Sequence, residues 1–135
     1  MNAADIDIGF LANRKVLVTG AAGFIGSHLC EALIQGGADV IGLDDMSAGK
    51  HSNVQLLNDH PNYSFVEASV CDESREMDSI FDGLDTVFHN AASKKNICLH
   101  NPQRDLAVNG GGTLNILSYA KKHNIRKIVH ASTGS

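Results

Sequence analysis

The sequence predicts an α/β fold of the doubly wound type, with a parallel sheet in the strand order 3-2-1-4-5. Short apolar runs rich in β-branched residues alternate along the chain with longer amphipathic stretches, which is the pattern of repeated β-α-β units. Right-handed connections between parallel strands leave few topologies for such a pattern. The chosen order places a ligand cleft beyond the carboxyl ends of the strands, where the order reverses beside the first strand.

Each strand is predicted from a short apolar run that ends at a polar or turn residue. We expect strands at residues 15–19, 40–43, 63–66, 85–89 and within 125–131. Helices are expected where apolar residues recur at helical spacing, at residues 23–36, at 72–82 and from Asn101 onward, and residues 46–62 are expected to form a loop with a short helix. Residues 1–13 precede the pattern and are expected to form a polar leader, without regular structure, before a domain at 14–135.

The last helix is predicted to be long and to begin at a defined residue. Asn101 can cap its first turn, and Pro102 occupies the first helical position, where a missing N–H costs nothing. The apolar face of this helix is expected to contain Leu106, Thr113, Leu114, Leu117 and Ala120.

Composition limits the class of protein. The chain has 135 residues, enough for one domain, and its 43% hydrophobic and 19% charged residues argue against a wholly disordered chain. A net charge of −4 argues against nucleic-acid binding, and no apolar run approaches the ~18 residues of a membrane span. Cys30, Cys71 and Cys98 are odd in number and form no C-x-x-C pair, which favours a reducing, cytoplasmic location. The seven histidines show no metal-ligand spacing, so no metal site is predicted.

A glycine-rich turn follows the first predicted strand and opens the first helix. Gly20, Gly23 and Gly26 recur at every third residue. Such a turn needs a tight bend, then a bare backbone that a pyrophosphate can approach, and finally close packing of helix on strand. The helix N-terminus adds free N–H groups and a positive dipole end for the anion. The alternative is an ordinary turn between strand and helix.

Two carboxylates follow the second strand. Asp44 lies 18 residues after Gly26, where a dinucleotide-binding fold places an acid on the adenosine ribose. Asp45 adds a second negative charge, so a ribose 2′-phosphate would be repelled and NAD is predicted over NADP. The alternatives are that Asp44 is a turn or cap residue, and that Lys50 and His51 nearby accommodate NADP.

Five segments in order resemble one known family. They are TGAAGFIGSHL, LDDMSAGK, VFHNAASK, NPQRDLAVNGGGTLNIL and IVHASTGS, between about residues 15 and 135. Together they resemble the extended short-chain dehydrogenase/reductase family, in its NAD-dependent epimerase/dehydratase group that acts on nucleotide sugars. The resemblance implies a Rossmann-like domain, NAD as cofactor, a nucleotide-sugar substrate for the full-length family, and a homodimer formed partly by the long helix.

The resemblance also implies roles for single residues. The residues implied at the pyrophosphate are Gly20, Gly23, Phe24, Ile25 and Gly26. Asp44 and Asp45 would hold the adenosine ribose end, and Ser69 with Val70 the adenine, Ser69 standing where the family usually has Asp. Those implied nearer the nicotinamide half are Ala91, Ala92, Lys94 and Asn109. Thr133 would hydrogen-bond the substrate hydroxyl as the catalytic residue.

Simpler roles remain open for several of these residues. Asn109 could brace its helix, Thr133 could be a turn residue, and Lys94 could be solvated surface. His89 is expected to be a packed core histidine rather than a catalyst, and Cys30 to lie in the core.

The family's catalytic Tyr-x-x-x-Lys motif does not occur in these 135 residues. We therefore expect a sheet truncated after strand five and a chain that binds NAD without turnover, as part of an epimerase- or dehydratase-like protein. A free-standing NAD-binding or regulatory module is the alternative, and an incomplete chain is a third interpretation.

Overall fold

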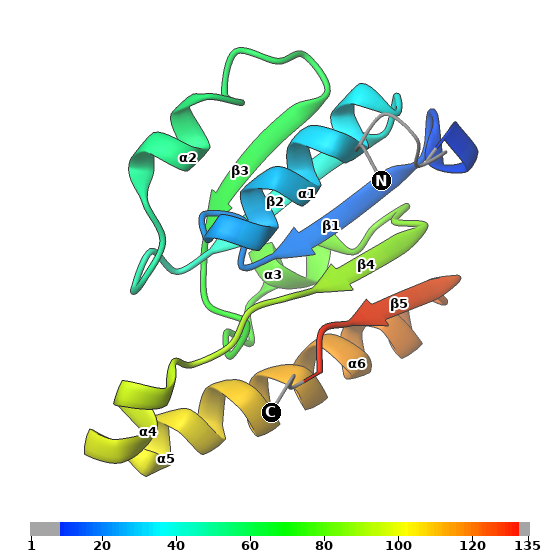
Figure 1. Ribbon diagram of the computed structural model, residues 1–135. Coiled ribbons are helices and arrows are strands. Elements are labelled where there is room, and N and C mark those ends of the chain that lie inside the picture. The colour runs from blue at the N-terminus through cyan, green and yellow to red at the C-terminus, as the bar shows by residue number, and fades with distance from the viewer. Residues whose placement is uncertain (1–8, 133–135) are drawn as a thin grey trace.

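The fold is a five-stranded parallel sheet with helices on both faces (Figure 1). The computed structural model describes residues 9–132, with only the backbone described for Lys95, Ile97 and Cys98. The strands are β1 (Lys15–Thr19), β2 (Asp39–Asp44), β3 (Tyr63–Glu67), β4 (Thr86–His89) and β5 (Lys127–His130). Their order in the sheet is β3-β2-β1-β4-β5, so the predicted doubly wound topology is confirmed.

Alternation along the strands separates two apolar layers. Val16 and Val18 of β1 face α1 (Phe24–Gln35), where they pack in one cluster with Cys30 and Leu33. Leu17 points to the other face and packs with the residues of α3 (Arg75–Ile80) and α6 (Thr113–Lys122). Cys30 is fully buried, as expected. A short helix, α2 (His51–Gln55), lies between β2 and β3, where a loop with a short helix is predicted.

The strand register brings the carboxyl ends of the central strands to one edge. Thr19 of β1 pairs with Leu43 of β2 on one side and with His89 of β4 on the other. His89 in turn pairs with His130 of β5. The turns that follow β1, β2 and β4 therefore meet at the same edge of the sheet, which is where the sequence predicts a ligand cleft.

The long helical region after β4 differs from its prediction in two ways. Asn101 caps α5 (Pro102–Leu106) by accepting from the Arg104 N–H at 3.0 Å, so the predicted start is confirmed. A π-helical segment, η3 (Ala107–Gly112), separates α5 from α6, and an additional helix, α4 (Lys95–His100), precedes α5 (Figure 1). Neither was predicted.

Of the five residues predicted for the apolar face of the long helix, only Ala120 is buried, so the prediction is wrong for the three leucines. The buried positions are Gly112, Ile116 and Ala120, whereas Leu106, Leu114 and Leu117 are 72%, 66% and 46% exposed. The helix turns its Gly112 face toward the sheet, because Gly112 packs so closely against Val70 that there is no room for a Cβ. The leucines consequently point away from the core.

The domain also begins earlier than predicted. The single turn of 3₁₀ helix η2 (Gly9–Leu11) precedes β1, and Leu11 is 1% exposed within the cluster beneath α1. Leu11, assigned to the polar leader from the sequence, is therefore packed in the core, while Phe10 beside it is 62% exposed. Within residues 9–132, no helix is both long and apolar enough to cross a bilayer.

Candidate functional site

The glycine loop after β1 is a tight, closely packed turn. Gly20 has a φ of 71°, a left-handed conformation that favours glycine, and a Cβ there would lie 3.0 Å from the backbone N of Ala91. A Cβ at Gly26 would overlap the carbonyl oxygen of Gly20. Both glycines are thus required by geometry, as the pattern of every third residue predicts.

The N-terminal end of α1 is open to a ligand. Gly23 is the N-cap residue and offers no side-chain hydrogen bond to the first turn, so the N–H groups of that turn are available to an anion. The side chains of Phe24 and Ile25 are 78% and 70% exposed, and the Phe24 ring packs against His28. What these two positions can give a pyrophosphate is therefore their backbone N–H groups.

Asp44 at the end of β2 holds the glycine loop. Its Oδ2 accepts from the Ala22 N–H at 3.0 Å, and its Oδ1 accepts from the Met46 N–H at 2.9 Å. Each carboxylate oxygen keeps a second lone pair that can accept from a ligand hydroxyl. The acid implied at the ribose thus lies beside the loop implied at the pyrophosphate.

Asp45 has different partners. Its Oδ1 accepts from the N–H and the hydroxyl of Ser47 at 2.9 and 2.6 Å, and its Oδ2 lies 3.7 Å from Nη2 of Arg104 on α5. Arg104 offsets part of the Asp45 charge. Asp44 is therefore the stronger obstacle to a ribose 2′-phosphate.

The loop after β4 forms the opposite side of the site. Ala91 is half-buried against Gly20, whereas Ala92 and Lys94 are exposed. Asn109 of η3 accepts from the Ser93 N–H at 2.7 Å and donates to Asp105 at 3.1 Å, so it braces this loop on the helix.

Two buried polar side-chain atoms of the loop after β4 lack a hydrogen-bond partner in the described part of the chain. The Nδ2 of Asn90 and the Oγ of Ser93 have no hydrogen-bond partner within residues 9–132. Buried polar atoms are rarely left unpaired, so these two suit a site that a polar ligand completes.

The residues implied at the adenine already form hydrogen bonds within the protein. Ser69 donates its N–H to Asp72 at 2.9 Å, and its hydroxyl accepts from the Cys71 N–H at 3.1 Å. Val70 is 4% exposed and accepts at its carbonyl from Asn115 at 2.8 Å. Ser69 keeps a hydroxyl proton that it can donate to a ligand.

His89 lies buried beneath the site, between two threonines. Its Nδ1 is 2.7 Å from the hydroxyl of Thr19, and its Nε2 is 3.0 Å from the hydroxyl of Thr113. Burial, and to a lesser extent the neighbouring His130, lower the pKa of His89 to about 4. A histidine that is 2% exposed and neutral fits the predicted core role.

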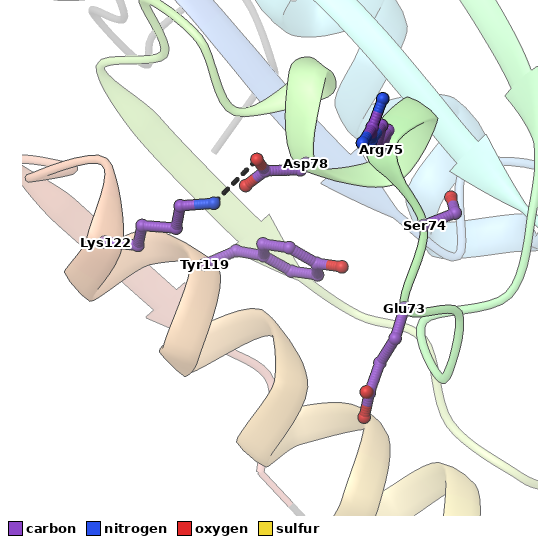
Figure 2. A pocket seen from close by; sticks show the side chains of 6 residues that line it. All are labelled: Glu73, Ser74, Arg75, Asp78, Tyr119 and Lys122. Atoms are coloured by element: carbon purple, nitrogen blue, oxygen red, sulfur yellow. Dashed lines mark hydrogen bonds and ion pairs between the residues drawn. The ribbon is translucent and has the colours of Figure 1, made fainter.

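Two hollows lie away from the glycine loop. The larger, about 320 Å³, is between α3 and α6, where Figure 2 shows Lys122 and Tyr119 pointing toward the helix that carries Asp78. Two of the charged residues that line it form an ion pair, with Lys122 Nζ 2.7 Å from Oδ2 of Asp78. The smaller, about 120 Å³, is an apolar cavity between α6 and the ends of β4 and β5. No group of three metal-ligating side chains occurs in the described part of the chain.

The structure brings together most of the residues that the sequence singles out. The glycine loop, Asp44 and the Ala91 loop meet at the carboxyl edge of the sheet, while Thr133 lies outside the described residues. Sequence reasoning missed Thr19 and Thr113. Thr19 could have been found, because it ends β1 and pairs in register with His89 on the neighbouring strand.

Comparison with known proteins gives the same assignment. The profile of the NAD dependent epimerase/dehydratase family matches residues 16–135. A UDP-glucose 4-epimerase from Mycolicibacterium smegmatis is 36% identical over 129 residues, covering 89% of this chain and 39% of the relative.

Solved structures share the fold as well. An epimerase from Methanothermobacter thermautotrophicus superposes with a TM-score of 0.87 at 35% identity, over 95% of this chain and 38% of that chain. The UDP-glucose 4-epimerase of Thermus thermophilus, in complex with NAD, has a TM-score of 0.76 at 35% identity, over 89% of this chain and 38% of that chain. This chain therefore spans less than half the length of these relatives. It belongs to the NAD-dependent epimerase/dehydratase family.

Proposed function

We propose that this chain is the NAD-binding part of a nucleotide-sugar epimerase or dehydratase. The observation that carries the proposal is the meeting of three features at one edge of the sheet. These are the glycine loop, which leaves no room for a Cβ at Gly20 or Gly26, the uncapped start of α1, and the Asp44 carboxylate. This combination suits a pyrophosphate joined to an adenosine ribose.

The residues present suit NAD at its pyrophosphate, at its adenosine ribose and near its nicotinamide half. The backbone N–H groups at the start of α1 would bind the pyrophosphate, and Asp44 would accept from the ribose hydroxyls. The unpaired Asn90 Nδ2 and Ser93 Oγ would meet the polar groups of the nicotinamide half. When bound, the nicotinamide ring of NAD accepts a hydride from the substrate.

The nucleotide-sugar substrate rests on the relatives, two of which are UDP-glucose 4-epimerases. Oxidation of a sugar hydroxyl needs a group that takes up its proton. We assign Thr133 a hydrogen bond to that hydroxyl, but a threonine cannot act as the base. Because no Tyr-x-x-x-Lys occurs in these 135 residues, we expect them to bind NAD without turnover.

The proposed assembly is a homodimer in a reducing, cytoplasmic setting. The exposed leucines of the long helix, Leu106, Leu114 and Leu117, support a partner surface, because large apolar side chains rarely gather on a free surface. The free thiols Cys30 and Cys71 support a reducing compartment.

Calorimetric titration with NAD tests the proposed function. Asp44→Asn should weaken NAD binding about tenfold, since it removes a charged acceptor from the ribose. Asp39→Asn is the matched control, because Asp39 is an exposed aspartate at the opposite end of the same strand. Equal affinity for NAD in the two variants would show that Asp44 does not contact the ligand. An unmodified chain that binds no NAD would overturn the proposal. An absorbance assay for NADH with UDP-sugars tests the expected lack of turnover.

A further inference from the structure

His89 joins the central strands to the loop after β4 through one chain of hydrogen bonds. Its ring links Thr19 of β1 to Thr113 at the start of α6, at 2.7 and 3.0 Å. The Thr113 hydroxyl donates to the carbonyl of Asn109 at 2.7 Å, and the side chain of Asn109 accepts from the Ser93 N–H at 2.7 Å. One buried ring thus connects β1, β4, the long helix and the wall of the cleft.

The direction of each proton follows from counting donors and acceptors. The Thr19 oxygen accepts from the N–H groups of Asn90 and Ala91, both at 3.1 Å, and these fill its two lone pairs. Its own proton must then point to Nδ1 of His89. A neutral imidazole that accepts at Nδ1 carries its proton on Nε2, which donates to Thr113.

This arrangement has no place for a second proton on the ring. An imidazolium would donate at Nδ1 as well, and the Thr19 oxygen has no lone pair left to accept. The other group that faces the ring is His130, stacked at 5.2 Å between ring centroids, and a positive charge there would further disfavour protonation. The low pKa of His89 agrees with this geometry.

The loop that Thr19 holds lies directly against the glycine loop. The backbone of Asn90 and Ala91 approaches Gly20 so closely that an added Cβ would lie 3.0 Å from both. A shift of this loop would therefore move the turn that is to receive the pyrophosphate.

We propose that His89 is a positioning residue for the dinucleotide, holding the loop from Asn90 to Ser93 against the glycine loop so that the cleft is formed before the ligand arrives. The inference rests on the proposed NAD binding. An ordinary core residue would change the affinity for NAD only by destabilising the fold. A substitution of His89 should weaken NAD binding more than its effect on stability alone would.

Matched variants of β4 test the inference. His89→Phe keeps a buried ring but removes both hydrogen bonds, whereas Val87→Ala, two residues earlier on the same face, creates a cavity outside the hydrogen-bonded chain. By calorimetry, His89→Phe should raise the Kd for NAD at least about tenfold, and Val87→Ala less than about twofold. His89→Gln, which offers one acceptor and one donor, should recover part of the affinity. Equal Kd values for His89→Phe and Val87→Ala would overturn the inference.

Nuclear magnetic resonance of the unmodified chain gives a readout that does not depend on any variant folding. The ¹⁵N signals of His89 should show a bare Nδ1 and a protonated Nε2 between about pH 5 and 8. A proton on Nδ1 in that range would contradict the inference.

The two proposals can fail separately. If the unmodified chain binds no NAD, the proposed function fails, and amide exchange then decides on His89. Faster exchange at Asn90, Ala91 and Ser93 in His89→Phe than in Val87→Ala would support the positioning role, and equal exchange would overturn it.

Discussion

At the scale of single residues, a buried hydroxyl without a partner is a local cost to the fold. Tyr63 on β3 is 8% exposed, and its hydroxyl oxygen has no hydrogen-bond partner within residues 9–132. Burial, with Cys30 and Asp44 nearby, raises the pKa of this phenol well above its usual range. The hydroxyl lies next to Gly42, where a Cβ would come within 2.5 Å of it, so the ring fills a space that only glycine leaves open.

Tyr63→Phe should therefore raise the free energy of unfolding by about 1 kcal/mol, since it removes a polar group that loses its hydration and gains nothing in return. Urea denaturation measures the change. Tyr119→Phe is the control, because the Tyr119 hydroxyl donates to the Asp72 carbonyl at 3.4 Å and its loss should give no gain. A less stable Tyr63→Phe would mean that the hydroxyl has a bound partner in solution.

Asp85 is the charged residue on which two arginines converge. Arg126 donates to both carboxylate oxygens at 2.9 and 2.8 Å, and Arg14 donates to Oδ1 at 2.8 Å. The hydrogen bonds from Arg126, opposed by desolvation, hold the pKa of Asp85 well below its usual range. The stabilisation is present above the unfolded pKa of about 3.9 and is lost as the pH falls toward the lower folded value.

Asp85→Asn should lower stability near neutral pH by about 1–2 kcal/mol, a modest value because both arginines are half exposed to solvent. The difference from the unmodified chain should shrink below about pH 4, because the Asp85 carboxylate of the unfolded chain takes up a proton there while that of the folded chain is still ionised. Thermal unfolding as a function of pH checks both. A difference that stays constant down to about pH 2 would exclude the charge as its cause, and exposed Asp59 serves as the control site.

At the scale of elements, the glycines of η3 are not equivalent. An added Cβ at Gly111 would meet nothing within 4 Å, whereas at Gly112 it would lie 2.5 Å from Cγ2 of Val70. Gly111→Ala should raise stability by up to about 1 kcal/mol through helix propensity. Gly112→Ala should lower it by about 1–3 kcal/mol through overpacking. Calorimetric melting of both variants tests this, and a lower Tm for Gly111→Ala would show that the π-helical segment itself needs glycine.

The elements differ in how far the sequence predicts them. Strands such as 15–19 are buried on both faces, so a continuous apolar run is sufficient to locate them. The inward face of α6 follows instead from the contact of Gly112 with Val70, which depends on residues 42 positions apart. Helical periodicity cannot detect that contact.

The residues of the candidate site also differ in whether the sequence predicts them. The glycine loop and Asp44 follow from spacing, because their chemistry is local to one turn and one strand end. The roles of Thr19, Thr113 and the unpaired Asn90 and Ser93 follow only from how β1, β4 and η3 are placed together.

At the scale of the whole molecule, one flank of the sheet is uncovered. β5 is the edge strand beside β4 and is largely exposed, with Val129 41% exposed. On the other face of the sheet, Leu114 and Leu117 give α6 an exposed apolar surface of its own.

We therefore expect concentration-dependent self-association, measured by sedimentation equilibrium. Leu114→Lys should weaken it at least about tenfold by burying a charge in the contact. Leu56→Lys is the control, because Leu56 is 83% exposed at the end of α2, away from this surface. Equal association of both variants would place the contact elsewhere.

Every role proposed for the residues of this site depends on NAD binding at the carboxyl edge of the sheet. Mapping backbone amide shifts during a titration with NAD tests this most directly. We expect the largest shifts at residues 20–26, at Asp44 and Asp45, and at residues 90–93, with small shifts on α3 and at the hollow lined by Tyr119 and Lys122. Absence of shifts at millimolar NAD, or shifts centred on that hollow, would contradict the account.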